Sequence, residues 1–330
     1  MKYRFLGTTG LRVSQVGFGT MSFGGDADEQ TSTQLFQQCR EAGVNLFDCA
    51  DVYQNGRSEE ILGKLIHDCR DEVVIASKAY FPTGDGPNER GASRYHVRRS
   101  VEASLRRLGT DRIDLYYIHR FDDVTAIEDV FTTLDILVRN GKILYPGVSN
   151  YAAWQVQKVL GIAERRSLVA PVAIQPMYNL VKRQAEVELF PMAQANSLGV
   201  IPYSPLGGGL LSGKYGVDDR PTTGRLMENK MYQARYGDDR VYAVASRFRD
   251  LAAEWGYHPV SLAIAWVGAH PAVTSPLIGA RSPAQLETAL KSVDIQLTAA
   301  ERAQISALSP TPPPATDRNE EHTKYNFGAR

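Results

Sequence analysis

Short apolar runs alternate along this chain with longer amphipathic stretches. The strand-like runs cover residues 16–19, 45–48, 73–78, 113–119, 143–148, 172–175, 200–203 and 273–278. The helical stretches cover residues 29–41, 58–67, 93–108, 126–139, 151–164, 185–197 and 240–255. Strands that alternate with helices are typical of βαβ units in a parallel sheet. Eight such units predict an α/β fold of the (β/α)8 TIM-barrel type, because doubly wound sheets usually have fewer strands.

The segments outside this alternation predict additions to one barrel domain that spans residues 1–330. An N-terminal β-hairpin over residues 2–12, with its turn at Thr8–Gly10, is expected to plug the lower end of the barrel. Residues 260–267 and 298–308 predict extra C-terminal helices, and the proline-rich stretch 311–330 predicts a surface tail. Long loops are expected over residues 79–92 and 206–239, on the rim where barrel active sites lie.

The composition narrows the class of protein. Lys+Arg and Asp+Glu both number 37, and a formal net charge of zero argues against nucleic acid or an anionic membrane as the main partner. No apolar run approaches the roughly 18 residues of a membrane span, and the N-terminus does not resemble a secretory signal. Three cysteines without CxxC spacing fit a reduced, cytoplasmic protein.

Four polar residues stand at or just after the ends of predicted strands. Asp48 and Tyr53 follow the second strand, Lys78 closes the third, and His119 closes the fourth. The carboxyl ends of barrel strands converge on one rim, so these side chains can share a pocket. Each residue alone has an ordinary interpretation, such as a turn aspartate, a solvated lysine, a packed tyrosine or a core histidine. Their joint placement favours a functional site.

These four residue types fit the reduction of a carbonyl group. Free tyrosine has a pKa near 10 and is a slow proton donor at neutral pH, whereas a nearby ammonium lowers that pKa. Tyr53 is therefore the expected general acid, with its pKa lowered by Lys78, and Asp48 is expected to hold the lysine. Neutral His119 can donate an N–H to the carbonyl oxygen and orient it.

The same residues carry a resemblance to the aldo-keto reductase family that extends along essentially the whole chain. Residues 47–60 resemble the family's Asp-to-Tyr signature, residues 75–78 its lysine motif, and residues 117–120 its histidine motif. The resemblance implies a carbonyl-reducing site with the same four residues in the same roles. Cys49 and Gln54 depart from the usual pattern, which has a small polar residue and glycine at these positions.

The resemblance implies a nicotinamide cofactor, although the chain has no Rossmann fingerprint. Gly207-Gly208-Gly209 lacks the required spacing and acidic residue. The resemblance implies that the cofactor contacts are Ser149, Asn150 and Gln175 at the nicotinamide amide, Tyr203 on its ring, Ser204, Leu206 and Gly208 along the pyrophosphate, and Gly279, Arg281 and Gln285 around the adenosine phosphate. Ordinary alternatives are helix capping by Ser149-Asn150, core packing of Tyr203 and a solvated Arg281.

Arg281 favours NADPH over NADH, because a guanidinium can pair with the 2′-phosphate. Gly279 would allow the backbone to approach the cofactor closely, and a helix that begins at Ser282-Pro283 would offer free N–H groups to an anion. Thr288-Ala289 depart from the Glu-Asn pair that usually contacts adenine in the family.

The substrate is expected to be a small carbonyl compound. Phe23, Tyr80, Phe81, Trp154, Tyr232 and Tyr236 are candidates for the pocket walls, which would suit aldehydes, ketones, quinones or open-chain sugars. A sugar or polyol dehydrogenase that works oxidatively is an alternative, as are a cofactor-binding regulatory subunit of the potassium-channel β type and a phosphate-binding barrel lyase or isomerase. The histidine spacing predicts no metal site, and the oligomeric state stays open.

Overall fold

The computed structural model describes residues 1–316, and its centre is an eight-stranded parallel sheet with the order β10-β3-β4-β5-β6-β7-β8-β9. The strands are β3 (Gly17–Gly19), β4 (Leu46–Asp48), β5 (Val74–Ala79), β6 (Ile113–Ile118), β7 (Ile143–Ser149), β8 (Ala173–Gln175), β9 (Gly199–Val200) and β10 (Leu277–Ile278). The sheet closes because the N–H groups of Thr274 and Leu277 donate to the carbonyls of Val200 and Pro202, at 2.8 and 2.9 Å. The predicted (β/α)8 barrel is confirmed.

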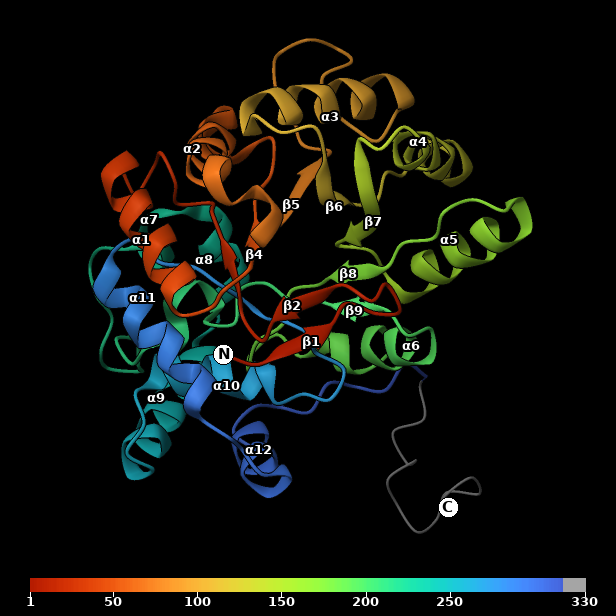
Figure 1. Cartoon of the computed structure of the whole chain (residues 1–330). Helices are drawn as coiled ribbons and strands as arrows, with labels where there is room; N and C mark the ends of the chain where they lie inside the picture. Colours follow the sequence, from red (N-terminus) through yellow and green to blue (C-terminus); the bar gives the residue numbers. More distant parts are fainter. Residues whose placement is uncertain (317–330) are drawn as a thin grey trace.

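Helices surround the strands on the outside of the barrel (Figure 1). The principal helices are α1 (Glu29–Glu41), α2 (Arg57–Ile66), α3 (Arg94–Leu108), α4 (Ile127–Arg139), α5 (Ala153–Arg166), α6 (Leu189–Ala195), α9 (Asp239–Glu254), α10 (Pro259–Gly268), α11 (Pro283–Leu290) and α12 (Ala299–Ser306). Shorter 3-10 turns are η1 (Tyr53–Gly56), η2 (His67–Glu72), η3 (Gln184–Glu186) and η5 (Lys291–Asp294). Local chemistry sets several ends: Asp28 and Ser93 cap α1 and α3 with side-chain oxygens, and Gly109 ends α3 at φ 61°.

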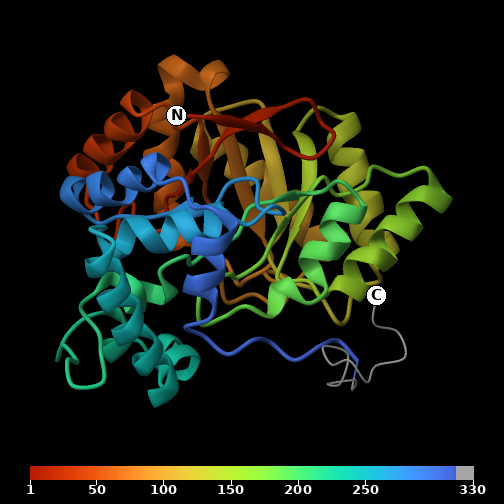
Figure 2. The ribbon, with the colours of Figure 1, turned by 90° about the horizontal axis from the view of Figure 1, so that it is seen from below.

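The predicted hairpin is present and covers the end of the barrel opposite the long β9–α9 segment (Figure 2). Its strands β1 (Tyr3–Phe5) and β2 (Arg12–Ser14) pair antiparallel, so the hairpin reaches two residues farther than predicted. Leu6 and Val13 are fully buried and pack against barrel residues that include Leu115 and Tyr117. The hairpin thus closes the lower end, as the sequence predicts.

Three boundaries were predicted wrongly. The segment 206–239 is not a plain loop, because it contains η4 (Gly207–Ser212), α7 (Arg225–Glu228) and α8 (Lys230–Tyr236). The predicted helix 185–197 is divided into η3 and α6. The strand predicted over residues 200–203 is a regular strand only through Val200, although its pairing continues, because the N–H groups of Ile201 and Tyr203 donate to the Ile174 and Pro176 carbonyls at 3.0 Å.

The chain beyond α12 only partly lies within the described structure. Residues 311–316 form no helix or strand and are mostly exposed, and the rest of the predicted tail, residues 317–330, lies outside the described residues. Among the helices of the described part, none is both long and apolar enough to cross a membrane.

Candidate active site

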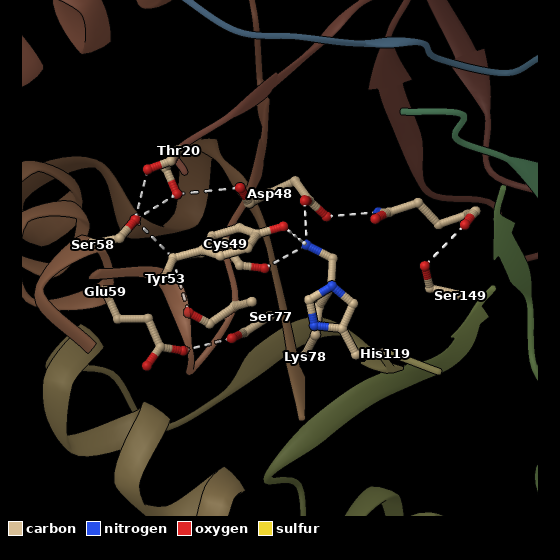
Figure 3. A network of polar contacts seen from close by, with 12 residues as sticks. Thr20, Asp48, Cys49, Tyr53, Ser58, Glu59, Ser77, Lys78, His119 and Ser149 are labelled. Carbon is tan, nitrogen blue, oxygen red and sulfur yellow. Dashed lines mark hydrogen bonds and ion pairs between the residues drawn. The ribbon is translucent and has the colours of Figure 1, made fainter. Parts of the chain in front are cut away.

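Neighbouring strands bring the four predicted residues together at the carboxyl-terminal rim (Figure 3). Asp48 is the last residue of β4, and Lys78 lies on the adjacent strand β5, two residues beyond the register partner of Asp48. His119 directly follows β6, and Tyr53 begins η1 after a short turn. Because adjacent parallel strands end at the same rim, residues 71 positions apart meet in one cluster.

Lys78 is the centre of this cluster. Its side chain is fully buried, and its ammonium donates hydrogen bonds to the Asp48 carboxylate, to the Cys49 carbonyl at 2.6 Å and to the Tyr53 hydroxyl at 3.4 Å. Burial by itself lowers the pKa of Lys78, but the Asp48 carboxylate opposes this effect and the net pKa lies above the ordinary value. Lys78 therefore stays charged beside the tyrosine.

The tyrosine itself does not follow the simple expectation. Burial raises the pKa of Tyr53, the positive charge of Lys78 lowers it, Asp48 raises it, and the net pKa lies above the ordinary value. The prediction that Lys78 lowers the Tyr53 pKa has the correct direction. The predicted net lowering of that pKa is wrong for the protein alone, because the removal of the phenolate from water has a larger effect than the ammonium. Tyr53 is thus a protonated donor over the whole neutral range.

His119 is uncharged in this environment. Burial and the nearby Lys78 charge place the pKa of its imidazole well below the ordinary value, so one ring nitrogen carries a proton and the other does not. Nδ1 is buried without a hydrogen-bond partner among the described residues. The ring lies edge-on to Tyr53, with centroids 6.0 Å apart, and to Phe81 at 4.8 Å. A neutral imidazole held beside a phenol can orient an incoming oxygen.

The residues proposed for the nicotinamide amide lie directly beside the four-residue cluster. Gln175 Nε2 donates to Asp48 Oδ2 at 2.8 Å, and Ser149 Oγ donates to the Gln175 carbonyl at 2.9 Å. Asn150 donates from Nδ2 to the His119 carbonyl at 2.9 Å and accepts at Oδ1 from the Tyr203 hydroxyl at 2.7 Å. Hydrogen bonds therefore join Gln175, at the end of β8, to Asp48, and Asn150 joins Tyr203 to His119.

The backbone after Tyr203 turns sharply along the predicted pyrophosphate path. Ser204 has φ 59° and Gly208 has φ 70°, both in the left-handed region. Leu206 precedes η4. A Cβ on Gly208 would lie 2.5 Å from the Tyr232 ring, so packing as well as backbone angle requires glycine there. Asn179, to which the sequence reasoning gave no role, holds the turn by donating to the Ser204 carbonyl at 3.0 Å.

The predicted adenosine-phosphate segment forms an open corner at the start of α11. A Cβ built on Gly279 meets nothing closer than the Gly19 carbonyl at 3.8 Å, so the protein leaves space beside this backbone. The Arg281 side chain is 46% exposed, and its Nη1 lies 3.7 Å from Asp26. Gln285 Oε1 accepts from the Arg281 N–H at 3.0 Å. This combination of open backbone and accessible guanidinium fits a phosphate-bearing nucleotide.

The family's usual adenine contacts have a different use in this chain. Thr288 donates its hydroxyl to the Ala284 carbonyl within α11, and Ala289 is buried against the core. Neither side chain offers a polar group to adenine, because one is satisfied within its helix and the other is apolar.

The candidate aromatic walls divide into two groups. Phe23 and Tyr236 are fully buried, so they are core residues rather than pocket walls. Tyr80 and Phe81 remain partly exposed; Phe81 lies beside His119, and the Tyr80 ring lies edge-on to Phe81 with centroids 5.5 Å apart. Tyr232 is almost fully buried, and its ring supports Gly208.

Trp154 belongs to a second aromatic group at the rim. Its side chain is exposed, and it lies edge-on to Phe121 with centroids 6.0 Å apart. Phe121, two residues after His119, was not singled out from the sequence. Its position directly beyond a predicted strand end was the signal that could have identified it.

A charged pair behind the site was also missed. Glu59 is completely buried, accepts from the Ser77 hydroxyl and pairs with Arg107 Nη2 at 2.6 Å. It connects α2, β5 and α3 next to the segment that carries Tyr53. The signal was an acidic residue at a helix position otherwise occupied by apolar side chains. Among residues 1–316, no group of three or more His, Cys, Asp or Glu side chains is placed to hold a metal ion.

Comparison with known proteins agrees with this geometry. A model described as the aldo/keto reductase family matches residues 15–310. The uncharacterized oxidoreductase YrpG of Bacillus subtilis is 39% identical over 90% of this chain and 92% of its own. A probable voltage-gated potassium channel subunit beta of Oryza sativa subsp. japonica is 37% identical over 89% and 92% of the two chains. Versiconal hemiacetal acetate reductase of Aspergillus parasiticus is 33% identical over 90% and 94%. With its barrel, rim cluster and matched length, the chain belongs to the aldo/keto reductase family, whose members generally use a nicotinamide cofactor.

Proposed function

We propose that this protein is an NADPH-dependent reductase of aldehydes and ketones. The observation that carries the proposal is the position of the Lys78 ammonium between the Asp48 carboxylate and the Tyr53 hydroxyl, with neutral His119 beside them. A buried lysine needs a carboxylate partner in any role, so the informative contact is the one to the Tyr53 hydroxyl, which lies beside the neutral His119 ring. This arrangement supplies a proton donor, a charge that stabilises its conjugate base and a group that orients an oxygen.

In the proposed reaction, the N–H of His119 donates to the carbonyl oxygen and holds it next to the Tyr53 hydroxyl. A nicotinamide cofactor held by Ser149, Asn150, Gln175 and Tyr203 would supply the hydride that the carbonyl carbon takes up. The Tyr53 O–H bond breaks as the proton moves to the oxygen, which gives the alcohol, and Lys78 stabilises the phenolate that forms. Asp48 keeps the lysine in place and charged. Proton return to Tyr53 then resets the site.

Cofactor contacts are proposed along the rim from the end of β7 to the start of α11. Ser149, Asn150 and Gln175 lie where they can bind a carboxamide, and the partly exposed Tyr203 ring can stack on a flat ring. Arg281 is the proposed partner of a 2′-phosphate, which gives NADPH the preference over NADH. Ser204, Leu206, Gly208, Gly279 and Gln285 are proposed to line the intervening path.

Two alternatives share this geometry. In a sugar or polyol dehydrogenase, the same four residues would catalyse the reverse reaction, with the Tyr53 phenolate as the base that removes the proton from the alcohol. A cofactor-binding regulatory subunit is favoured by one observation, the 37% identity to two proteins named as probable potassium channel β subunits. The intact four-residue cluster supports turnover, and so the reductase is placed first.

The experiment that tests the proposal uses NADPH deuterated at C4 of the nicotinamide, with separate samples for the two faces of the ring. The protein is incubated with an activated aromatic aldehyde, and the alcohol is analysed by mass spectrometry. We expect deuterium in the alcohol from only one of the two labelled NADPH samples, and only when the protein is present. Tight NADPH binding without alcohol formation would favour the regulatory subunit, whereas turnover only with an alcohol and NADP⁺ would favour the dehydrogenase.

A further inference from the structure

A cavity of about 710 Å³ lies on the outer side of the barrel, along α3 and the segment that precedes it. None of the four residues of the proposed catalytic cluster lines it. Its volume falls within the roughly 300–1,000 Å³ of small-molecule sites. The proposed function does not use this cavity.

The walls of the cavity are rich in arginine, and two of these arginines are unpaired. Arg98 and Arg106 both line it, are exposed and have no ion-pair partner within residues 1–316. The other three, Arg94, Arg99 and Arg107, have carboxylate partners at 3.5, 3.7 and 2.6 Å. Two free guanidinium groups on one helix favour an anionic group with several acceptor oxygens.

The cavity also contains a carboxylate that the protein leaves without a partner. Asp51 lines the cavity and is 2% exposed, and neither of its side-chain oxygens accepts a hydrogen bond within the described structure. A buried acceptor without a donor is destabilising. Burial and the Glu59 charge raise the pKa of Asp51 to about 7, against the lowering effect of the Arg107 charge. Both oxygens are buried, so a ligand hydroxyl can supply the missing donor only after the side chains that cover them move aside.

These two features together restrict the ligand. Above its pKa of about 7, Asp51 is ionised and repels a simple anion that has no donor, and the arginines repel a simple cation. A molecule with both a phosphate and hydroxyl groups satisfies both, because its oxygens accept from the guanidinium groups and its hydroxyls donate to the carboxylate. We propose that this cavity is a second binding site, separate from the catalytic rim, for a phosphorylated polyhydroxy compound.

The position of Asp51 suggests which part of the protein such a ligand would influence. Asp51 lies two residues before Tyr53, and its N–H donates to the Lys78 carbonyl at 3.1 Å. A ligand that binds Asp51 therefore contacts the same short segment that positions the proposed proton donor. Binding in the cavity can be read out without any cofactor, so the proposal does not depend on the reaction.

The test is calorimetric titration with myo-inositol 1-phosphate, which has no carbonyl for the catalytic rim to recognise. We expect wild-type protein to bind it at least about tenfold more tightly than myo-inositol or inorganic sulfate, since it alone carries both recognition groups. The double variant Arg98→Ala/Arg106→Ala is expected to lose this binding. Arg165→Ala removes an exposed arginine of α5 that lies outside the cavity, and it should bind normally.

Two further variants make the outcome decisive. Asp51→Asn removes the charge that excludes sulfate, so the preference over sulfate should fall by about tenfold. Arg281→Ala should leave the binding of myo-inositol 1-phosphate intact. If Arg281→Ala loses this binding and Arg98→Ala/Arg106→Ala keeps it, the ligand binds at the proposed nucleotide site, and the cavity site is overturned. Absence of binding to the wild-type protein would also overturn it. If Asp51→Asn does not fold, the arginine variants still decide the question.

Discussion

The ammonium of Lys78 lies 3.4 Å from the hydroxyl of Tyr53, within a site where burial alone raises the pKa of that hydroxyl. The protein places a charge next to a group that the surroundings otherwise keep neutral. Proton donation to a carbonyl needs the protonated tyrosine, and the lysine stabilises the phenolate that remains. The two effects together define what the site does as pH changes.

The first prediction concerns this pH dependence. Reduction should be constant through neutral pH and fall only as the pH rises through the Tyr53 pKa, because the donor must be protonated. Lys78→Met should lower kcat by about 100-fold or more and move the alkaline decline to higher pH, since the charge that lowers the Tyr53 pKa is gone. The measurement is kcat/KM for aldehyde reduction against pH for both proteins. An unchanged profile in the variant would mean that Lys78 does not act on the tyrosine.

The second prediction concerns cofactor choice. Arg281→Ala should weaken NADPH binding by about tenfold or more and NADH binding by much less, because only NADPH carries the phosphate that the guanidinium would bind. Dissociation constants from fluorescence titration would check this. Arg165→Ala is the matched control, an exposed arginine without an ion pair in the described structure. Equal losses for both cofactors would remove Arg281 from this role.

A third prediction follows from the burial of Asp51. Its pKa is about 7 in the folded protein against an ordinary value of 3.8, so between these values the folded state holds a proton that the unfolded state has lost. Stability contributed by this group therefore falls as pH rises from about 4 to 7, by up to about 1.4 kcal/mol per pH unit. Asp51→Asn should be close to wild type near pH 4 and more stable near pH 8.

Urea unfolding at the two pH values measures this difference. Asp85→Asn, an exposed change in the loop before α3, serves as the control and should show no such gain. A variant that is equally destabilised at both pH values would show that the Asp51 carboxylate is satisfied in the folded protein.

The fourth prediction concerns the buried pair of Glu59 and Arg107. Arg107→Met leaves a carboxylate with no exposed surface unpaired, and we expect a loss of about 3 kcal/mol in the free energy of unfolding. Adding Glu59→Gln removes the stranded charge and should restore most of that loss. Denaturant unfolding of both single variants and the double variant gives the coupling energy. Additive losses would mean that the pair is not coupled.

The parts of this molecule that follow simple periodicity were predictable, and those that depend on tertiary contacts were not. Alternating apolar and amphipathic stretches predict the barrel, and polar residues at strand ends predict the cluster around Lys78. The net shift of the Tyr53 pKa was predicted wrongly, because burial depends on residues remote in sequence. Likewise, nothing local distinguishes Phe23, which packs fully inside the core, from Phe81, which borders His119.

The segment after Tyr203 shows the same limit. Its glycines and prolines indicate a loop, yet Tyr232 packs over Gly208 and short helices form around it. The pair of Glu59 and Arg107 spans 48 positions, and only the packing of α2 against α3 brings it together.

The most direct test of the proposed reductase is the Tyr53→Phe variant, which removes one hydroxyl and keeps the ring. NADPH consumption with an activated aromatic aldehyde is followed by nicotinamide absorbance, and NADPH binding is measured in parallel. The account predicts that kcat falls by at least about 100-fold while the dissociation constant for NADPH changes by less than about threefold. A variant that binds NADPH normally and keeps a near-normal kcat would show that Tyr53 is not the proton donor.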